Sequence, residues 1–214
     1  MDASQVLKQY FGYDSFRKGQ SDIIEAILQG QDALAIMPTG AGKSVCYQVP
    51  AMLLSGITIV ISPLISLMQD QVKSLNEAGI NAAYINSTLS EQQMYKALDY
   101  AAQGKYKIIY VAPERLETMS FMTFAQKADI SMVTIDEAHC ISQWGQDFRP
   151  SYLKIVDFID SLPERPVVSA FTATATSEVK TDIECILKLL CLRRYIPQGR
   201  RIKYFTPKDT SYHI

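Results

Sequence analysis

The chain has 214 residues, of which 48% are apolar and 20% are charged, and its formal net charge is −1. This length suits one α/β domain with a sizeable core and is too short for two full lobes. No apolar run approaches the 18 residues of a membrane span, and the first residues lack the basic and apolar regions of a secretory signal. We therefore expect a globular protein without a membrane span that is not exported.

The near-zero net charge gives no support for nucleic-acid binding, but the charge is unevenly distributed along the chain. Residues 1–187 carry 14 basic and 21 acidic side chains, whereas residues 188–214 carry 7 basic and 1 acidic. The character of the chain therefore changes near residue 188.

The chain has four cysteines, namely Cys46, Cys140, Cys185 and Cys191. Their spacings match neither a zinc-binding pattern nor a small disulfide framework. We expect reduced thiols in a cytoplasmic protein, and no zinc.

Short apolar runs alternate with helical periodicities along most of the chain. We expect strands at 33–37, 57–61, 82–85, 108–111, 132–135 and 167–171. Helical spacing is found at 64–78 and 91–103, and two further helices are expected before the first strand, at 2–11 and 20–29. Regular alternation of this kind predicts a mainly parallel sheet covered by helices on both faces, with functional loops at the carboxyl ends of the strands.

The first strand leads into the string Met37-Pro-Thr-Gly-Ala-Gly-Lys-Ser44, a glycine turn before a helix. Gly40 and Gly42 allow successive backbone N–H groups to point inward, Lys43 can reach the β- and γ-phosphates, and the Ser44 hydroxyl can ligate Mg2+. The positive end of the helix dipole also favours phosphate. Met37 replaces the first glycine of the usual pattern, so the match is partial, and an ordinary glycine turn is the alternative.

A pair of carboxylates, Asp136 and Glu137, ends the β-branched run at 132–135. At the tip of a buried parallel strand, Asp136 can hold the Mg2+ shell, commonly through water, while Glu137 orients and deprotonates an attacking water. An acidic helix cap is the alternative for an isolated pair. The phosphate-binding turn upstream favours the catalytic interpretation.

The string Asp136-Glu-Ala-His139 resembles superfamily 2 helicases, and residues 140–152, with Trp144, Phe148 and Arg149, resemble the aromatic-rich loop of RecQ-family DNA helicases. Further strings match that family in the same order, at 11–20, 62–71, 112–116 and 171–176. The resemblance covers residues 7 to about 187. It implies the RecA-like three-layer α/β sandwich of P-loop NTPases.

The resemblance also assigns nucleotide contacts. Tyr13 would stack on adenine, and Arg17 and Gln20 would contact the base, for which the Gln20 amide offers both a donor and an acceptor. Packing against the N-terminal helices is the alternative for Tyr13. The full set of expected ATP-binding residues is Tyr13, Arg17, Gln20, Thr39, Gly40, Gly42, Lys43, Ser44 and His139.

The aromatic-rich loop is the best clue to the substrate. Trp144 and Phe148 lie among polar and glycine residues typical of an exposed loop, where aromatic side chains stack on bases, and Arg149 follows them. The resemblance implies that this loop reports DNA occupancy to Glu137. Core packing is the alternative for Phe148 and, less strongly, for Trp144.

The threonines Thr172, Thr174 and Thr176 would link the carboxylates to the DNA-facing surface, as the family's third motif is thought to do. Capping of the helix that follows them is the alternative interpretation.

Polar residues also follow three other expected strands, at Ser62, Asn86-Ser-Thr88 and Arg115. Hydroxyl groups and an arginine at these positions suit phosphodiester contacts along a single strand. Helix capping is an equally good account of the serines and the threonine. Arg115 has the alternative of pairing with a neighbouring acid.

The resemblance ends near residue 187. Helicases of this family need a second RecA-like lobe, whose arginine completes the ATP site, and residues 189–203 do not continue the family's pattern of a strand and a link to that lobe. We interpret residues 188–214 as a divergent basic tail, truncated or frameshifted and poorly ordered. A basic arm that binds nucleic acid is the alternative.

The sequence thus predicts that residues 1–187 form the ATP-binding motor lobe of a RecQ-like, ATP-dependent DNA helicase. The resemblance implies that the whole protein unwinds DNA 3'-to-5' in recombination and repair. Its expected cofactors are ATP and Mg2+, its expected partners are single-stranded DNA, DNA junctions and the missing second lobe, and its expected location is the bacterial cytoplasm or nucleoid. The isolated chain is expected not to unwind DNA. The alternatives are a nucleotide-dependent single-stranded DNA-binding module and an RNA helicase lobe, although the loop at 144–150 argues against RNA.

Overall fold

The described residues of the computed structural model, 1–190 and 193–195, form a seven-stranded, wholly parallel sheet with the order β3-β4-β2-β5-β6-β1-β7. The strands are β1 (Ala33–Ile36), β2 (Ile57–Ile61), β3 (Ala82–Ile85), β4 (Ile108–Val111), β5 (Ile130–Ile135), β6 (Val167–Thr172) and β7 (Arg193–Tyr195). Crossovers within a parallel sheet require connections long enough to hold a helix, and helices fill most of them.

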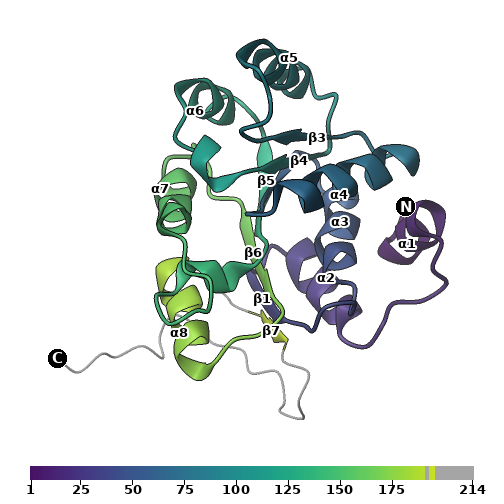
Figure 1. Cartoon of the computed structure of the whole chain (residues 1–214). Coiled ribbons are helices and arrows are strands. Elements are labelled where there is room, and N and C mark those ends of the chain that lie inside the picture. Colours follow the sequence, from purple (N-terminus) through teal and green to yellow (C-terminus); the bar gives the residue numbers. More distant parts are fainter. Residues whose placement is uncertain (191–192, 196–214) are drawn as a thin grey trace.

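Helices cover both faces of the sheet, which makes the three-layer sandwich that the sequence predicted (Figure 1). One face packs against α5 (Glu91–Ala102), α6 (Met119–Ala125), α7 (Lys154–Asp160) and α8 (Ser177–Ile186). The other packs against α2 (Gln20–Leu28), α3 (Lys43–Leu53) and α4 (Ile65–Glu77), and α1 (Ala3–Phe11) lies outside α2 and α3. Within the described residues, no helix combines the length and hydropathy needed to cross a bilayer.

Three short 3-10 helices lie in the loops between these elements. They are η1 (Pro113–Arg115), η2 (Ala138–Ile141) and η3 (Pro150–Leu153). Two of them, η2 and η3, follow β5, so the segment that carries the predicted catalytic and aromatic residues is folded rather than extended.

Local sequence signals explain where several helices begin. Asp2 and Ser90 each form a reciprocal capping box, with Gln5 and Gln93 respectively, and satisfy the free N–H groups at the starts of α1 and α5. Thr176 accepts a hydrogen bond from the backbone N–H of Val179 and caps α8. These caps account for element boundaries that agree with the expected ones to within one or two residues.

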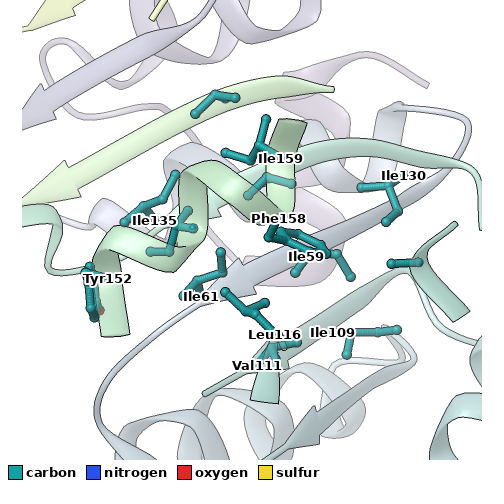
Figure 2. Close-up of a cluster of buried hydrophobic side chains, with 14 of the residues drawn as sticks. Ile59, Ile61, Ile109, Val111, Leu116, Ile130, Ile135, Tyr152, Phe158 and Ile159 are labelled. Carbon is teal, nitrogen blue, oxygen red and sulfur yellow. The ribbon is translucent and has the colours of Figure 1, made fainter. Parts of the chain in front are cut away.

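The alternation of side chains along each strand divides the core into two apolar layers. Ile59 and Ile61 of β2 belong to the cluster on the side of α5 to α8, whereas Val60 belongs to the cluster on the side of α2 to α4. Figure 2 shows part of the first cluster, in which Phe158 of α7 also packs against Phe121 of α6 with ring centroids 5.6 Å apart. Burial on both faces explains why these strands are continuous apolar runs.

The structure differs from the sequence expectation after residue 187. Residues 193–195 form β7, which pairs in parallel with β1 in the register Ala33 with Arg193 and Ala35 with Tyr195. A three-residue strand at the edge of a sheet tolerates charge, so it lacks the apolar pattern of the inner strands. Arg194 also forms an ion pair with Glu184 of α8. The rest of the expected tail, residues 191–192 and 196–214, lies outside the described residues. The boundary at 187 stays a prediction.

A buried carboxylate fastens this end of the sheet. Asp32, which is only 1% exposed, accepts hydrogen bonds from both terminal nitrogens of Arg165, at 3.3 and 2.7 Å, and from the backbone N–H groups of Val168 and Leu190, at 2.8 and 2.5 Å. The same side chain therefore joins the beginnings of β1 and β6 to the segment that leads into β7.

Replacement of Asp32 by alanine is expected to lower the free energy of unfolding by about 3 kcal/mol, because it leaves a guanidinium and two backbone N–H groups without their acceptor. Urea denaturation followed by circular dichroism measures the change. As a matched control, Asp14→Ala removes an exposed ion pair with Lys8 (3.0 Å) and is expected to change stability by less than about 0.5 kcal/mol. Equal effects of the two substitutions would contradict the assignment.

Candidate active site

The predicted phosphate-binding turn lies at the carboxyl end of β1, between β7 and β6. Gly40 and Gly42 have positive φ angles of 81° and 84°, a conformation that side chains disfavour, and α3 begins at Lys43. A Cβ atom on Gly42 would lie 2.5 Å from Nε2 of Gln20. Glycine is therefore favoured at position 42 by its left-handed conformation, and a side chain there would also displace the amide of Gln20.

The segment before α2 holds this turn by its backbone. Nε2 of Gln20 donates to the carbonyl oxygens of Gly42 (3.0 Å) and Ala41 (3.3 Å), and Nη1 of Arg17 donates to that of Gly40 (2.5 Å). Oε1 of Gln20 accepts from the backbone N–H of Arg17 at 2.8 Å. Sequence reasoning did not anticipate these contacts, and the roles of both residues in base recognition stay predictions.

A cavity of about 360 Å³ opens beside the turn. Most of the predicted nucleotide residues line it: Tyr13, Arg17, Gln20, Thr39, Gly40, Gly42, Lys43, Ser44, Asp136 and Glu137. Tyr13 is 51% exposed, so its ring is available to a ligand rather than packed into the N-terminal helices. The structure thus brings together residues separated by more than 100 positions in the chain.

A larger hollow, of about 960 Å³, lies at the opposite edge of the sheet and is lined by Ile57, Ile80 and Lys107 near the amino ends of the strands. It contains none of the predicted site residues. We place the active site at the smaller cavity because loops at the carboxyl ends of parallel strands carry the phosphate-binding turn and the paired carboxylates.

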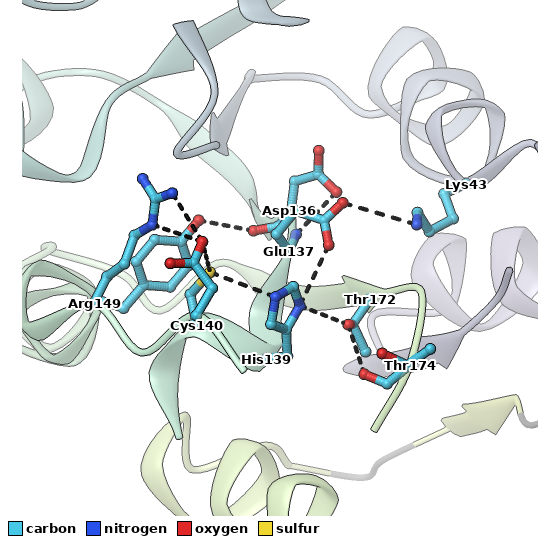
Figure 3. A network of polar contacts seen from close by, with 10 residues as sticks. Lys43, Asp136, Glu137, His139, Cys140, Arg149, Thr172 and Thr174 are labelled. Atoms are coloured by element: carbon cyan, nitrogen blue, oxygen red, sulfur yellow. Dashed lines mark hydrogen bonds and ion pairs between the residues drawn. The ribbon is translucent and has the colours of Figure 1, made fainter. Parts of the chain in front are cut away.

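The two carboxylates occupy different environments at the end of β5 (Figure 3). Asp136 is 6% exposed, and its Oδ1 accepts the backbone N–H of Glu137 at 3.0 Å. Glu137 has a left-handed φ of 48°, which is rare for a residue other than glycine and marks local strain typical of functional sites. Its Oε1 lies 4.0 Å from Nζ of Lys43, and its Oε2 lies 3.3 Å from Nδ1 of His139.

These environments move the pKa values of the two acids in opposite directions. Burial, reinforced by the charge of Glu137, raises the pKa of Asp136 to about 6. The contact with His139, assisted by Lys43, lowers the pKa of Glu137. Contacts with the Cys140 thiol and the Glu137 carboxylate raise the pKa of His139 to about 10. At neutral pH Glu137 is therefore an ionised base beside two cations.

His139 links this base to β6. Its Nδ1 lies 2.9 Å from Oγ1 of Thr172, whose own proton is donated to the carbonyl of Thr174 at 3.0 Å. His139 must therefore donate to Thr172. The backbone of Thr172 also accepts the N–H of Met37 at 2.9 Å, which connects the histidine to the phosphate-binding turn. Thr176 caps α8, whereas the proposed link of Thr172 and Thr174 to the DNA-facing surface stays a prediction.

The aromatic-rich loop folds back beside η2. Trp144 is 75% exposed, whereas Phe148 is partly buried, which leaves the tryptophan free to stack on a ligand. Arg149 binds Oδ2 of Asp147 through Nε (3.1 Å) and Nη2 (2.8 Å), and its Nη1 donates to the carbonyl of Pro63 at 3.3 Å. This arginine therefore connects the loop to the segment after β2.

Three polar groups near the carboxyl ends of β2, β3 and β4 have no hydrogen-bond partner within the described part of the chain. They are Oγ of Ser62, Nδ2 of Asn86 and Nε of Arg115, all buried. Ser62 does not cap α4, whose first turn has no side-chain cap, and Ser90 rather than Ser87 or Thr88 caps α5. Unpaired buried polar groups are rare. These atoms are closed off from solvent in this structure, so their contacts with a phosphodiester stay predictions.

The residues present fit a magnesium ion. Mg2+ prefers oxygen ligands and is usually held by one or two carboxylates together with phosphates and water. Ser44 and Asp136 supply a hydroxyl and a carboxylate on the wall of the same cavity. Tyr152 stabilises this strand end, because its buried hydroxyl donates to the carbonyl oxygen of Asp136 at 2.9 Å.

The sequence model of the DEAD/DEAH box helicase family matches residues 17–182. The ATP-dependent DNA helicase RecQ of Bacillus subtilis is 55% identical over 182 residues, which are 85% of this chain and 31% of that protein. RecQ of Haemophilus influenzae is 48% identical over 91% of this chain and 31% of its own length. The chain thus spans about a third of these curated relatives, and the resemblance to RecQ helicases is confirmed.

Solved helicase structures share the fold. The DUF1998 helicase MrfA bound to DNA and AMPPNP superposes with a TM-score of 0.73 at 17% identity, over 93% of this chain and 29% of that one. The Hef helicase domain of Pyrococcus furiosus gives a TM-score of 0.67 at 19% identity, over 93% and 40% of the two chains. These similarities confirm the predicted RecA-like architecture.

The raised pKa of Asp136 predicts a pH dependence of magnesium-dependent nucleotide binding. Mg2+ needs the ionised carboxylate, so lowering the pH from 7.5 to 5.5, through the pKa of about 6, should weaken the apparent Mg2+ affinity by about fourfold. Mg2+ titrations of a bound fluorescent ATP analogue measure this change. In Asp136→Asn only the nucleotide phosphates still titrate, so this variant should lose the part of the pH dependence that comes from Asp136. A variant with the same pH profile as the wild type would contradict the prediction.

Proposed function

Because this chain belongs to the DEAD/DEAH box helicase family, we propose that it is the ATP-binding motor lobe of a RecQ-like DNA helicase. The observation that supports this most directly is the convergence of Lys43, Ser44, Asp136 and Glu137 on one cavity that also contains the predicted adenine residues. The two RecQ relatives, which are 55% and 48% identical to this chain, support DNA rather than RNA as the substrate.

Each of the residues Lys43, Ser44, Asp136 and Glu137 has a defined part in the proposed ATP hydrolysis. Lys43 and the N–H groups of the glycine turn bind the β- and γ-phosphates. Ser44 and Asp136 would hold Mg2+, which would supply positive charge to the phosphate oxygens. Glu137, kept ionised by His139 and Lys43, orients the attacking water and accepts its proton.

The path of single-stranded DNA follows the carboxyl ends of β2, β3 and β4. Trp144 supplies an exposed ring for a base, and the buried, unpaired groups of Ser62, Asn86 and Arg115 would have to become exposed to reach phosphate oxygens. His139 lies between Glu137 and Thr172, and Arg149 joins the aromatic-rich loop to the carbonyl of Pro63, next to Ser62.

Unwinding requires more than this lobe. In our proposal a second RecA-like lobe supplies the arginine that neutralises the transition state, and the whole helicase moves 3' to 5' on DNA during recombination and repair in the bacterial cytoplasm. An arginine of this kind contributes a factor of about 10³ to 10⁵ to the rate in related phosphoryl-transfer enzymes. The 214-residue chain should therefore bind ATP weakly and hydrolyse it slowly.

Steady-state ATPase assays of the purified chain, with and without single-stranded DNA, test the assigned roles. Glu137→Gln should abolish the residual hydrolysis while nucleotide binding persists, whereas Lys43→Ala should lose nucleotide binding. Glu25→Gln, an exposed acid on α2, is the matched control and should match the wild type. Fast DNA-stimulated turnover by the wild-type chain would refute the need for a second lobe.

The intrinsic fluorescence of Trp144, the only tryptophan, reports on the nucleic-acid surface. Single-stranded DNA should quench it more strongly than RNA of the same sequence. In an anisotropy assay with labelled DNA, Trp144→Ala should weaken binding by about fivefold or more, since stacking on a base contributes about 1 to 3 kcal/mol. Tyr95→Ala removes another exposed aromatic residue, on α5, and should have no effect.

The same assay distinguishes the alternative of a DNA-binding module without helicase activity. Removal of residues 196–214 keeps β7 intact and deletes most of the basic tail. The DNA-binding module would be favoured if that variant lost salt-dependent DNA binding while Trp144→Ala bound DNA as strongly as the wild type.

A further inference from the structure

Two hydrogen bonds to the Ser142 hydroxyl connect the aromatic-rich loop to helix α8. Ser142 directly follows η2 and is fully buried, and its Oγ donates to Oδ2 of Asp182 on α8 at 2.6 Å. The same Oγ accepts the backbone N–H of Trp144 at 3.1 Å. Neither ATP hydrolysis nor DNA binding, as proposed above, gives Asp182 a role.

The direction of these hydrogen bonds follows from the chemistry of the groups. A backbone N–H can only donate, so the Ser142 oxygen accepts from Trp144 and gives its single proton to the carboxylate of Asp182. Hydrogen bonds to a carboxylate are shorter and stronger than those between neutral groups. Asp182 therefore fixes the rotation of the hydroxyl, and the hydroxyl fixes the backbone at Trp144.

Helix α8 is held in place by the apolar core. Val179 and Ile183, which precede and follow Asp182, are 3% and 0% exposed. They belong to the same apolar cluster as Cys140 and Ile141 of η2. The carboxylate of Asp182 therefore projects from a helix that packs against the beginning of the loop.

The turn that carries Trp144 lies tightly against η2. The backbone N–H of Gly145 donates to the carbonyl of Ser142 at 3.0 Å, and a Cβ atom on Gly145 would lie 2.4 Å from the carbonyl oxygen of His139. The Trp144 side chain is nevertheless 75% exposed. Its backbone is thus anchored while its ring stays accessible, and a preorganised residue of this kind loses less entropy on binding a ligand.

We propose that Asp182 is the positioning residue of the aromatic-rich loop, and that it orients Trp144 for stacking on DNA by fixing the Ser142 hydroxyl. Asp182 itself touches neither DNA nor nucleotide. The inference rests on the proposed function, because it assigns a role at the same DNA-facing surface.

Positioning and simple electrostatics predict opposite effects of removing Asp182. Loss of preorganisation should weaken DNA binding, because Trp144 must then be ordered during binding. Loss of a negative charge alone should strengthen binding to the phosphate backbone. The sign of the change therefore separates the two explanations.

The time-resolved fluorescence anisotropy of Trp144, the only tryptophan, tests the anchor in the free 214-residue chain. Asp182→Ala and Ser142→Ala should each increase the amplitude of nanosecond depolarisation, because the loop loses its support. Asp182→Asn keeps an acceptor oxygen and should restore most of the wild-type decay. Thr181→Ala is the matched control on α8, since the Thr181 hydroxyl donates to the carbonyl of Ser177 in the same helix at 3.0 Å, and no change is expected.

An anisotropy titration with labelled single-stranded DNA tests the consequence for binding. Asp182→Ala should weaken binding by about threefold, although it removes a negative charge. When Trp144→Ala is already present, adding Asp182→Ala should cause no further loss, because the ring that Asp182 positions is absent. Circular dichroism establishes that each variant is folded.

Several results would overturn the inference. One is unchanged depolarisation in Asp182→Ala, or in Ser142→Ala if the first variant does not fold. Others are unchanged or tighter DNA binding by Asp182→Ala, and a further threefold loss on adding Asp182→Ala to Trp144→Ala. Wild-type DNA binding by Trp144→Ala alone would instead refute the proposed function of that ring.

Discussion

The pairing of β6 with β5 on one side and β1 on the other is the constraint on which the active site depends. Backbone hydrogen bonds in a parallel ladder fix the spacing of neighbouring strands to about 4.8 Å. The phosphate-binding turn leaves β1 and the carboxylates leave β5, so β6 sets the distance between them. Thr172 ends β6 and contacts both sides, through Met37 and His139. Thr172, at the end of β6, thus contacts both segments whose separation β6 sets.

The electrostatics of the site assign different tasks to adjacent acids. Asp136 is buried, which raises its pKa to about 6, whereas His139 and Lys43 lower the pKa of Glu137. Pairs of titratable groups whose environments separate their pKa values commonly divide acid, base and metal-binding roles between them. Burial disfavours the ionised form of Asp136, and a divalent cation beside it would favour that form. Binding of the metal and ionisation of Asp136 should therefore favour each other.

Local motifs allowed much of this site to be predicted from the sequence. The glycine turn and the Asp136-Glu137 pair are each made of neighbouring residues, so they can be recognised in the sequence. Strands such as β2 and β4 can be recognised because they are uninterrupted apolar runs. The contact of Gln20 with the turn was not predictable in the same way, because it joins residues more than 20 positions apart.

Other features depended on tertiary proximity. The hydrogen bond between Ser142 and Asp182 joins residues 40 positions apart in the sequence, and neither residue by itself indicates its partner. The short edge strand β7 lacks the apolar pattern by which strands are recognised, and its place is fixed by β1 and Glu184.

The role of β7 and Asp32 has a practical consequence for the limits of the folding unit. A protein ended at residue 187 would keep every predicted catalytic residue, yet β1 would become an open edge, and one acceptor site of a buried carboxylate would lose its N–H partner from Leu190. Open parallel edges template association with other chains. Expression boundaries for this lobe should therefore be drawn beyond Tyr195, because the residues that cover the edge of the sheet at β1 differ from those that carry its chemistry.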